Sequence, residues 1–214
     1  MSSETVVSRL NALLQQAGIA PLDHETAANF EAYLSLILRW NARLNLTSLR
    51  TEDAIISIHL AESIALAKAI SSDVKTLLDF GSGAGFPGIP IALCRPEIAV
   101  TLAESQGKKA AFLQEAVRTL GIAAKVHSGR AETLQSVFDC VTLRAVDKMP
   151  QAVRAAAGLV APGGWLALMT TNAGLANLQV AAGKEFSWPR TAPLSGSTDR
   201  IVAFGQRHSA KQTT

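Results

Sequence analysis

Residues Val74 to Ile91, VKTLLDFGSGAGFPGIPI, decide the fold of this chain. The apolar pair Leu77-Leu78 predicts a strand that is buried on both faces, and Asp79 closes it. Pro87 and Pro90 stand where a first helical turn would begin, the one place where a helix accepts proline. Between the strand and the helix lie the glycines Gly81, Gly83, Gly85 and Gly88. The stretch therefore predicts a strand, a glycine-rich loop and a helix, which is how a sheet builds a nucleotide site.

The glycine loop does not by itself name the nucleotide. Gly83-x-Gly85-x-x-Gly88 fits the dinucleotide pattern and favours NAD. Asp79-x-Gly81-x-Gly83-x-Gly85 fits the acidic-start pattern of S-adenosylmethionine (SAM) enzymes. A loop that only makes a turn is a third interpretation, but two overlapping glycine patterns with an acid at the strand end are hard to explain by turn-making alone. NAD and SAM both stay open at this point.

Length and composition predict one substantial domain with a packed core, because the chain has 214 residues and is 48% hydrophobic and 17% charged. No apolar run approaches the roughly 20 residues that span a bilayer. The first ten residues hold an acid and no hydrophobic signal region, so we expect a cytoplasmic protein without a membrane partner. Cys94 and Cys140 lie in apolar segments and predict core thiols rather than a disulfide. Residues 1–72 carry more acidic than basic side chains, and residues 73–214 the reverse, which is compatible with a nucleic-acid substrate.

The pattern along the chain predicts helices first and an alternation of strands and helices afterwards. Residues 1–72 read as a helical cap, in which Asp23 is the expected N-cap of the second helix and the third runs from about 52 to 70. Tyr33, Trp40 and His59 in this cap are expected to pack in the core. Further strands are predicted at 98–102, 123–127, 138–143 and 165–170, and further helices at 108–120 and 150–159. Strands that alternate with helices form a parallel sheet.

The end of the chain follows a different pattern. Residues 184–206 alternate polar and apolar around a turn at Ser195-Gly196-Ser197, which predicts an antiparallel hairpin. A mostly parallel seven-stranded α/β sheet that ends in such a hairpin is the Rossmann-like fold of SAM-dependent methyltransferases. We therefore expect a helical cap over 1–72, a SAM-binding domain over 73–207 and a mobile tail over 208–214, in a monomer.

Two acidic positions are candidate cofactor contacts. Glu104 ends the second predicted strand, where a carboxylate accepts hydrogen bonds from ribose hydroxyls in either cofactor interpretation and disfavours NADP. Ala131-Glu132 follow the third predicted strand, where adenine lies in the methyltransferase architecture. The backbone N–H of this pair can bond the adenine ring and the carboxylate its exocyclic amine. The alternatives are a surface acid for Glu104 and an acid at a helix start for Glu132.

The end of the fourth predicted strand lacks the sequence signatures of two chemistries. Enzymes that methylate exocyclic amines commonly carry Asn/Asp-Pro-Pro-Tyr/Phe at this place, whereas here it reads Thr142-Leu143-Arg144-Ala145. Methylation of pyrimidine C5 needs a cysteine nucleophile on a loop, but Cys140 lies inside the strand.

At this point the chain resembles the RsmG (GidB) family. The matching stretches are Trp40-Asn41, Asn45-Leu46-Thr47, His59-x-x-Glu62-Ser63, DFGSGAGFPGIP (79–90), GKKAAFL (107–113), Gly129 to Glu132 and Leu143-Arg144-Ala145. The resemblance implies methylation of N7 of a guanine in 16S ribosomal RNA, with SAM as cofactor and the 16S rRNA or the small ribosomal subunit as partner. It places the cofactor site on Gly81, Phe86, Ala131, Glu132 and Arg144, with Glu104 as the ribose-binding acid.

Two positions depart from the family pattern. The family usually has Asp-Ser after the histidine, where this chain has Glu62-Ser63. It also has Lys-Gly after the fifth strand, where this chain has Met169-Thr170-Thr171. The RNA is therefore expected to be held in a different way at the second of these positions.

The implied mechanism needs few side chains, because guanine N7 has a free lone pair and no proton to remove. We expect the rate to come from proximity and orientation, and we assign neither a catalytic side chain nor a metal site. Two alternatives remain: a methyltransferase of the same fold that acts on a small molecule or a protein, and an NAD-binding regulatory module.

Four basic residues are candidate RNA contacts. Arg39 and Arg43 lie four apart in the second predicted helix and share a face, and Lys108 and Lys109 begin the helix after the second strand. In an open α/β sheet this helix start lies at the rim of the site. The alternative is that these are ordinary solvated charges.

Overall fold

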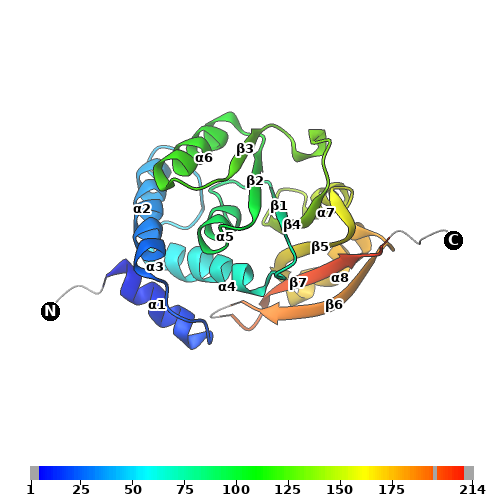
Figure 1. The fold of residues 1–214 in the computed structure, drawn as a ribbon, viewed down its shortest axis with the longest axis horizontal. Helices are drawn as coiled ribbons and strands as arrows, with labels where there is room; N and C mark the ends of the chain where they lie inside the picture. Colours follow the sequence, from blue (N-terminus) through cyan, green and yellow to red (C-terminus); the bar gives the residue numbers. More distant parts are fainter. Residues whose placement is uncertain (1–4, 195–196, 210–214) are drawn as a thin grey trace.

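A seven-stranded sheet forms the centre of the protein, seen in a computed structural model that describes residues 5–194 and 197–209 (Figure 1). The strands are β1 (Thr76–Phe80), β2 (Ala99–Glu104), β3 (Lys125–Ser128), β4 (Phe138–Arg144), β5 (Val160–Thr171), β6 (Phe186–Pro193) and β7 (Arg200–Arg207). Their order is β3-β2-β1-β4-β5-β7-β6, in which β7 alone runs antiparallel to its neighbours β5 and β6. The predicted mostly parallel sheet with a closing hairpin is confirmed. Residues 195–196 of the predicted hairpin turn and 210–214 of the predicted tail lie outside the described residues.

The fifth strand is longer than the sequence pattern predicts. β5 begins at Val160 and includes Pro162-Gly163-Gly164, which precede the strand that the sequence predicts at 165–170. β4 pairs Phe138 with Val160 but Cys140 with Trp165, so the extra residues of β5 bulge out of the ladder. Gly163 has φ +79°, a conformation that L side chains rarely adopt. The proline and glycines therefore mark a bulge inside a strand.

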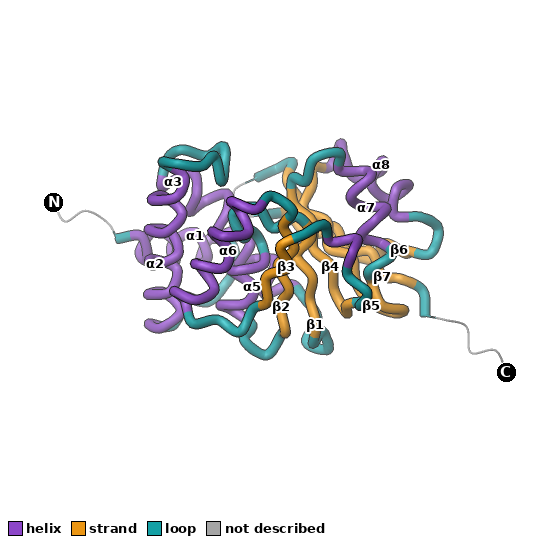
Figure 2. Tube along the Cα trace, turned by 90° about the horizontal axis from the view of Figure 1, so that it is seen from above, coloured by secondary structure: helices purple, strands orange, loops and turns teal. Residues whose placement is uncertain are grey.

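Helices cover both faces of the sheet, as Figure 2 shows. They are α1 (Val6–Gln16), α2 (His24–Asn41), α3 (Glu52–Ala54), η1 (Ile55–Leu60), α4 (Ala61–Ala69), α5 (Gly88–Cys94), α6 (Gly107–Leu120), η2 (Ala131–Thr133), α7 (Met149–Ala157) and α8 (Asn172–Ala182). α7 and α8 bury their apolar sides with Leu78, Val141 and Leu166 of the sheet. The other face carries α5 and α6, and the N-terminal helices pack outside them. The sequence pattern did not predict α8.

The N-terminal helices share one hydrophobic core with the sheet. Leu10 and Leu34 of the cap belong to the same buried cluster as Leu77 of β1 and Leu102 of β2. Apolar contact is thus continuous across residue 72, and the division of the chain into a cap and a SAM-binding domain stays a prediction. In the described residues no helix is both long and apolar enough to pass through a bilayer.

Two local predictions in the cap are refined by the structure. Asp23 is the N-cap of α2, since its carboxylate accepts a hydrogen bond from the backbone N–H of Thr26 over 2.9 Å. The predicted helix over 52–70 is continuous but contains a π-helical turn, η1. Such turns are frequent at functional sites. η1 carries His59, and its position is described below.

Candidate cofactor site

The end of β1 is fastened to the glycine loop by Asp79, which is buried. Its Oδ2 accepts a hydrogen bond from the backbone N–H of Gly88 over 3.2 Å, and its Oδ1 accepts one from the Thr142 hydroxyl over 3.0 Å. Burial raises the pKa of the Asp79 carboxyl to about 6, although these donors act in the opposite direction. Asp79 of β1 therefore connects this strand to β4 and to the start of α5. These two bonds fix the position of the glycine loop between β1 and α5.

The positions of the loop glycines require glycine for different reasons. A Cβ on Gly88 would lie 2.7 Å from Asp79 Oδ2, and a Cβ on Gly85 would lie 2.5 Å from Ile89 Cδ1. Both glycines therefore serve close packing under the loop. Gly83 has φ +56°, and a Cβ on it would meet no atom closer than 3.9 Å, the carbonyl oxygen of Gly81. A Cβ on Gly81 would lie 3.0 Å from Val146 Cγ2. Gly83 is thus the loop glycine at which the backbone borders open space, where a ligand can approach it closely.

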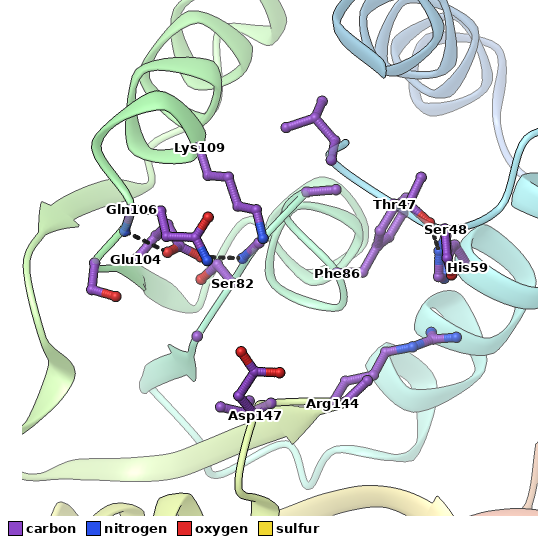
Figure 3. A pocket seen from close by; sticks show the side chains of 17 residues that line it. Thr47, Ser48, His59, Ser82, Phe86, Glu104, Gln106, Lys109, Arg144 and Asp147 are labelled. Atoms are coloured by element: carbon purple, nitrogen blue, oxygen red, sulfur yellow. Dashed lines mark hydrogen bonds between the residues drawn. The ribbon is translucent and has the colours of Figure 1, made fainter. Parts of the chain in front are cut away.

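A cavity of about 360 Å³, the loop cavity, lies above this backbone (Figure 3). It opens at the carboxyl ends of β1, β2 and β4, where the sheet order turns from one direction to the other, the usual place of a ligand in such sheets. Its lining residues are Leu46, Thr47, Ser48, His59, Gly81, Ser82, Gly83, Ala84, Phe86, Glu104, Ser105, Gln106, Lys109 and 144–147. Five separate segments of the chain therefore build one cavity.

Glu104 is held in place at one end of the loop cavity. Its Oε2 accepts a hydrogen bond from the backbone N–H of Gly83 over 2.9 Å, and its Oε1 accepts one from that of Gln106 over 2.7 Å (Figure 3). A carboxylate oxygen has room for a further donor. The two backbone bonds therefore orient the carboxylate without using up its capacity, which suits recognition of vicinal hydroxyl groups.

The cap forms the opposite wall of the loop cavity. The His59 ring stacks on Phe86 at 4.5 Å between ring centroids, and its Nε2 lies 2.7 Å from the hydroxyl of Thr47. Burial, helped by the charge of Arg144, lowers the pKa of His59 to about 3, so the imidazole is neutral at pH 7. The Tyr33 hydroxyl donates to the carbonyl of Ala84 over 2.5 Å and supports the loop. The expectation that His59 only packs in the core is incomplete, because it also lines the cavity.

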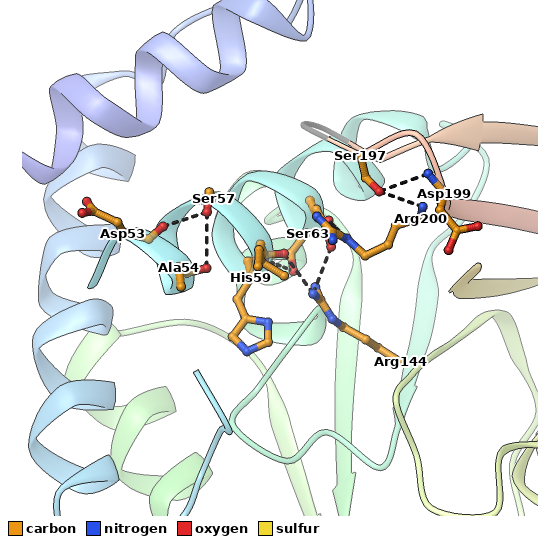
Figure 4. A network of polar contacts seen from close by, with 11 residues as sticks. Asp53, Ala54, Ser57, His59, Ser63, Arg144, Ser197, Asp199 and Arg200 are labelled. Carbon is orange, nitrogen blue, oxygen red and sulfur yellow. Dashed lines mark hydrogen bonds and ion pairs between the residues drawn. The ribbon is translucent and has the colours of Figure 1, made fainter. Parts of the chain in front are cut away.

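Arg144 is the last residue of β4, and its side chain is part of a buried polar network (Figure 4). Its Nη2 donates to the carbonyl of Ile58 and to Glu62 Oε2, each over 2.9 Å. The Nε of Arg200 donates to Glu62 Oε1 over 2.6 Å, so both carboxylate oxygens of Glu62 are occupied. Burial lowers the pKa of the Arg144 guanidinium. Its Nη1 is buried and has no hydrogen-bond partner among the described residues.

The structure gathers five of the eight predicted cofactor residues around the loop cavity: Gly81, Gly83, Phe86, Glu104 and Arg144. Gly85 packs beneath the loop. Ala131 and Glu132 lie in η2 beyond β3 and do not line the cavity; Ala131 is buried, and Glu132 accepts a hydrogen bond from Arg130 over 3.0 Å. Their contact with adenine stays a prediction. Among the lining residues that were not predicted, Asp147 follows β4 and gave no signal in the sequence.

The four predicted RNA contacts divide into two places. Arg39, Arg43 and Lys108 line a groove of about 570 Å³ between α2 and α6, where Arg39 forms an ion pair with Glu115. The sequence analysis placed Arg43 in the second helix, but α2 ends at Asn41. Arg43 therefore lies in the turn that follows this helix. Lys109 points away from this groove and lines the loop cavity (Figure 3). The adjacent lysines therefore serve different surfaces.

Fold and site together define a class, the Rossmann-like methyltransferases. A predicted O-methyltransferase from Agrobacterium tumefaciens has the same fold with a TM-score of 0.57 at 20% identity, over 69% of this chain and 81% of that one. The crystal structure of TrmN from Thermus thermophilus matches with a TM-score of 0.55 at 18% identity, over 71% of this chain and 53% of that one. At such identities the likeness concerns the fold alone.

The sequence identifies the family within this class. Residues 26–187 match the family GidB, described as rRNA small subunit methyltransferase G, and the chain belongs to it. A protein from Xanthomonas oryzae pv. oryzae named ribosomal RNA small subunit methyltransferase G is 42% identical, over 69% of this chain and 70% of its own length. The resemblance found in the sequence motifs is confirmed.

Proposed function

We propose that this protein transfers the methyl group of SAM to N7 of a guanine in 16S ribosomal RNA, as a monomer in the cytoplasm. One observation carries the proposal: Glu104 is oriented by the backbone of Gly83 at the switch point of the sheet, in a chain of the small-subunit rRNA methyltransferase G family. Ribosomal RNA as substrate supports the cytoplasm.

The charges around the loop cavity fit SAM. Glu104 would accept hydrogen bonds from the ribose hydroxyls, and the backbone at Gly81 and Gly83 would lie against the ligand. Asp147 is available for the ammonium group of the methionine part, and Arg144 and Lys109 for its carboxylate. We retain Ala131 and Glu132 as the proposed adenine contacts. SAM supplies an electrophilic methyl group when bound, and the chain's own residues orient it and exclude water.

The transfer requires no general base. The nucleophile is the N7 lone pair, which carries no proton at neutral pH. His59 is the histidine of the loop cavity, and with a pKa of about 3 it is uncharged and needs to take up no proton in the reaction. The protein's contribution is therefore to hold the acceptor nitrogen in line with the methyl carbon and the sulfur.

The proposal is tested by incubating the purified protein and labelled SAM with small ribosomal subunits from cells that lack it. We expect 7-methylguanosine at one position of the 16S rRNA, detected by chemical cleavage of the chain at that nucleotide. The variant Glu104→Gln should transfer more slowly, because it loses roughly 1–3 kcal/mol of cofactor binding when a charged acceptor becomes neutral. Label in protein, or in RNA at an atom other than guanine N7, would contradict the substrate assignment.

The cofactor is tested separately by thermal unfolding. A ligand that binds the native state raises the melting temperature. We expect S-adenosylhomocysteine to stabilise the protein and NAD at the same concentration to leave it unchanged. Stabilisation by NAD alone would contradict the methyltransferase assignment and favour a dinucleotide-binding module.

A further inference from the structure

The groove of about 570 Å³ between α2 and α6, here called the Trp40 groove, lies beside the loop cavity. Leu44 lines the groove, and Leu46, two positions further along the chain, lines the loop cavity. At the start of α6, Lys108 lines the groove and Lys109 lines the loop cavity. The same two segments of the chain therefore form walls of both openings. A long ligand that reaches the loop cavity can continue into the groove.

The Trp40 groove presents positive charge that no acid of its own wall neutralises. Glu115 is the acidic side chain among its lining residues. It is already occupied, because one carboxylate oxygen accepts from Arg39 and the other accepts from the indole Nε1 of Trp40 over 3.1 Å. Arg43 and Lys108 are exposed and form no ion pair within the described part of the chain. These two cations are therefore available to an anionic ligand such as a phosphate group.

The aromatic residue of the groove is fixed in place and still accessible. Trp40 packs edge-on against Phe112, with 5.7 Å between the ring centroids, and donates its indole N–H to Glu115. It is half-buried, so part of the ring remains open at the groove. Unpaired RNA bases stack on aromatic side chains, whereas the bases of a duplex are already stacked on one another. An aromatic ring beside free cations therefore favours single-stranded RNA over a duplex and over an acidic peptide, whose carboxylates offer no ring.

We infer that the Trp40 groove binds an unpaired nucleotide of the substrate RNA, with its base against Trp40 and its backbone phosphate between Arg43 and Lys108. This inference rests on the proposed function and adds a contact to the RNA outside the cofactor site. A nucleotide held here anchors the strand whose guanine enters the loop cavity. Two linked contacts bind more tightly than either alone, because the second one forms within the same complex. The groove thus raises the affinity for RNA and takes no part in the transfer step.

The tryptophan indoles provide the direct test. The chain has three, and Trp40 lines the groove, whereas Trp165 and Trp188 lie in β5 and β6. The protein is labelled with ¹⁵N at the indoles and saturated with S-adenosylhomocysteine, which occupies the proposed cofactor site. A short single-stranded oligoadenylate should then shift the Trp40 signal and leave the signals of Trp165 and Trp188 unchanged. This probe contains no guanine, so the titration does not depend on the methyl acceptor.

Two further ligands separate single-stranded RNA from other occupants. The same oligoadenylate paired with oligouridylate, and a polyglutamate peptide of matched charge, should each give at most about a tenth of the Trp40 shift at equal concentration, because neither offers an unstacked base. An equal response to the duplex would overturn the preference for an unpaired nucleotide. An equal response to polyglutamate would overturn the inference and favour an acidic protein partner. A Trp40 signal that does not move with oligoadenylate up to its solubility limit would overturn the stacking contact.

Activity tests the phosphate contact. Arg43→Ala should raise the KM for small ribosomal subunits about tenfold and leave kcat unchanged, the pattern of a lost binding contact that is equal in ground and transition states. Arg43→Lys keeps the charge and should stay close to the wild-type KM. Arg118→Ala removes an exposed cation at the other end of α6 and is the matched control, with a wild-type KM. A wild-type KM for Arg43→Ala, or an equal rise in Arg118→Ala, would overturn the phosphate contact.

The two measurements separate this inference from the proposed function. If wild-type protein does not methylate small subunits, the proposed function fails, while the indole titration still reports on the groove. If the wild type methylates guanine N7 but Trp40 does not respond to oligoadenylate and Arg43→Ala has the wild-type KM, only the assignment of the Trp40 groove is wrong.

Discussion

The two halves of the candidate site are built in different ways. On the β2 side, Glu104 is held by the backbone of Gly83 and Gln106, which lie within a short stretch of chain around the glycine loop. On the β4 side, Arg144 is held by Ile58 and Glu62, which precede it by 86 and 82 residues. Arg200 also donates to Glu62, and it follows that acid by 138 residues. Local sequence thus forms the β2 half of the site, and tertiary contact forms the β4 half.

The two halves also differ in the kind of interaction that holds their side chains in place. Every polar atom that orients Glu104 is a backbone N–H, whose position depends on the loop conformation alone. The Arg144 network consists of buried charges, and Glu62 is 1% exposed between two arginines of which Arg144 is 11% exposed. Removing one partner from such a network leaves the others uncompensated. Substitutions on the β4 side should therefore change the stability of the protein more, and substitutions on the β2 side should change its affinity for the cofactor more.

The largest expected effect is on stability and comes from Glu62→Ala. It leaves Arg144 buried without its carboxylate, and we expect a loss of about 3–5 kcal/mol in the free energy of unfolding. Urea denaturation measures it. Glu132→Ala, which removes the partner of the exposed Arg130, is the matched control and should cost at most about 1 kcal/mol. Equal losses in the two variants would mean that the buried network is not the stabilising element of the β4 side.

The next effect is on cofactor affinity and comes from Gly83→Val. The side chain would project into open space at the loop cavity, from a backbone with φ +56° that disfavours it. We expect the affinity for S-adenosylhomocysteine to fall at least about 100-fold, or roughly 2.7 kcal/mol, measured by calorimetry. The melting temperature should remain well above the assay temperature. Unchanged affinity would mean that the β2 half does not hold the cofactor.

Two buried groups of the site, His59 and Asp79, should respond to pH with opposite signs. The folded pKa of His59, about 3, lies below its ordinary value of 6.5, so the unfolded state takes up the proton first and stability is lost as the pH falls below about 6.5. The folded pKa of Asp79, about 6, lies above its ordinary value of 3.8, so the native state takes up the proton first and stability is gained as the pH falls through 6. In wild-type protein the two effects largely cancel.

Single variants expose each contribution. Between pH 6.5 and pH 5, Asp79→Asn should lose about 2 kcal/mol of stability, because only the His59 effect remains. His59→Gln should gain about 1 kcal/mol over the same interval, because only the Asp79 effect remains. Urea denaturation at the two pH values gives both slopes. Slopes of the same sign in the two variants would contradict the assignment.

The smallest expected effect is on RNA binding. It distinguishes the outer surface of the β2 side from the loop cavity. Lys108→Ala should reduce the slope of log affinity for rRNA against log salt by about 1, the value for one lost phosphate contact, and leave cofactor affinity unchanged. Arg118→Ala, an exposed basic residue at the other end of α6, is the matched control. A wild-type slope for Lys108→Ala, or the same change in both variants, would place the RNA surface elsewhere. Lys109 is not used, because it lines the loop cavity.

Much of the fold follows from local patterns. The strand, loop and helix around Asp79, the parallel alternation and the closing hairpin were all predicted, because buried strands and amphipathic helices have different hydrophobic periods. Other features left no such signal. α8 is apolar with little amphipathic pattern, so no period identifies it. The bulge in β5 carries proline and glycines, which also mark turns, and only its pairing with β4 distinguishes the two.

The sequence by itself determined the class of site, since glycines after a buried strand and an acid at the end of the next strand are constraints that neighbouring residues impose on the backbone. Tertiary structure alone decided which glycine borders the cavity, which of two adjacent lysines faces it, and that His59 and Arg144 meet there. These outcomes depend on packing between segments that are remote in the chain. The physical reason is that backbone conformation is set over a few residues, whereas burial, desolvation and ion pairing are set by whichever segments the fold brings together.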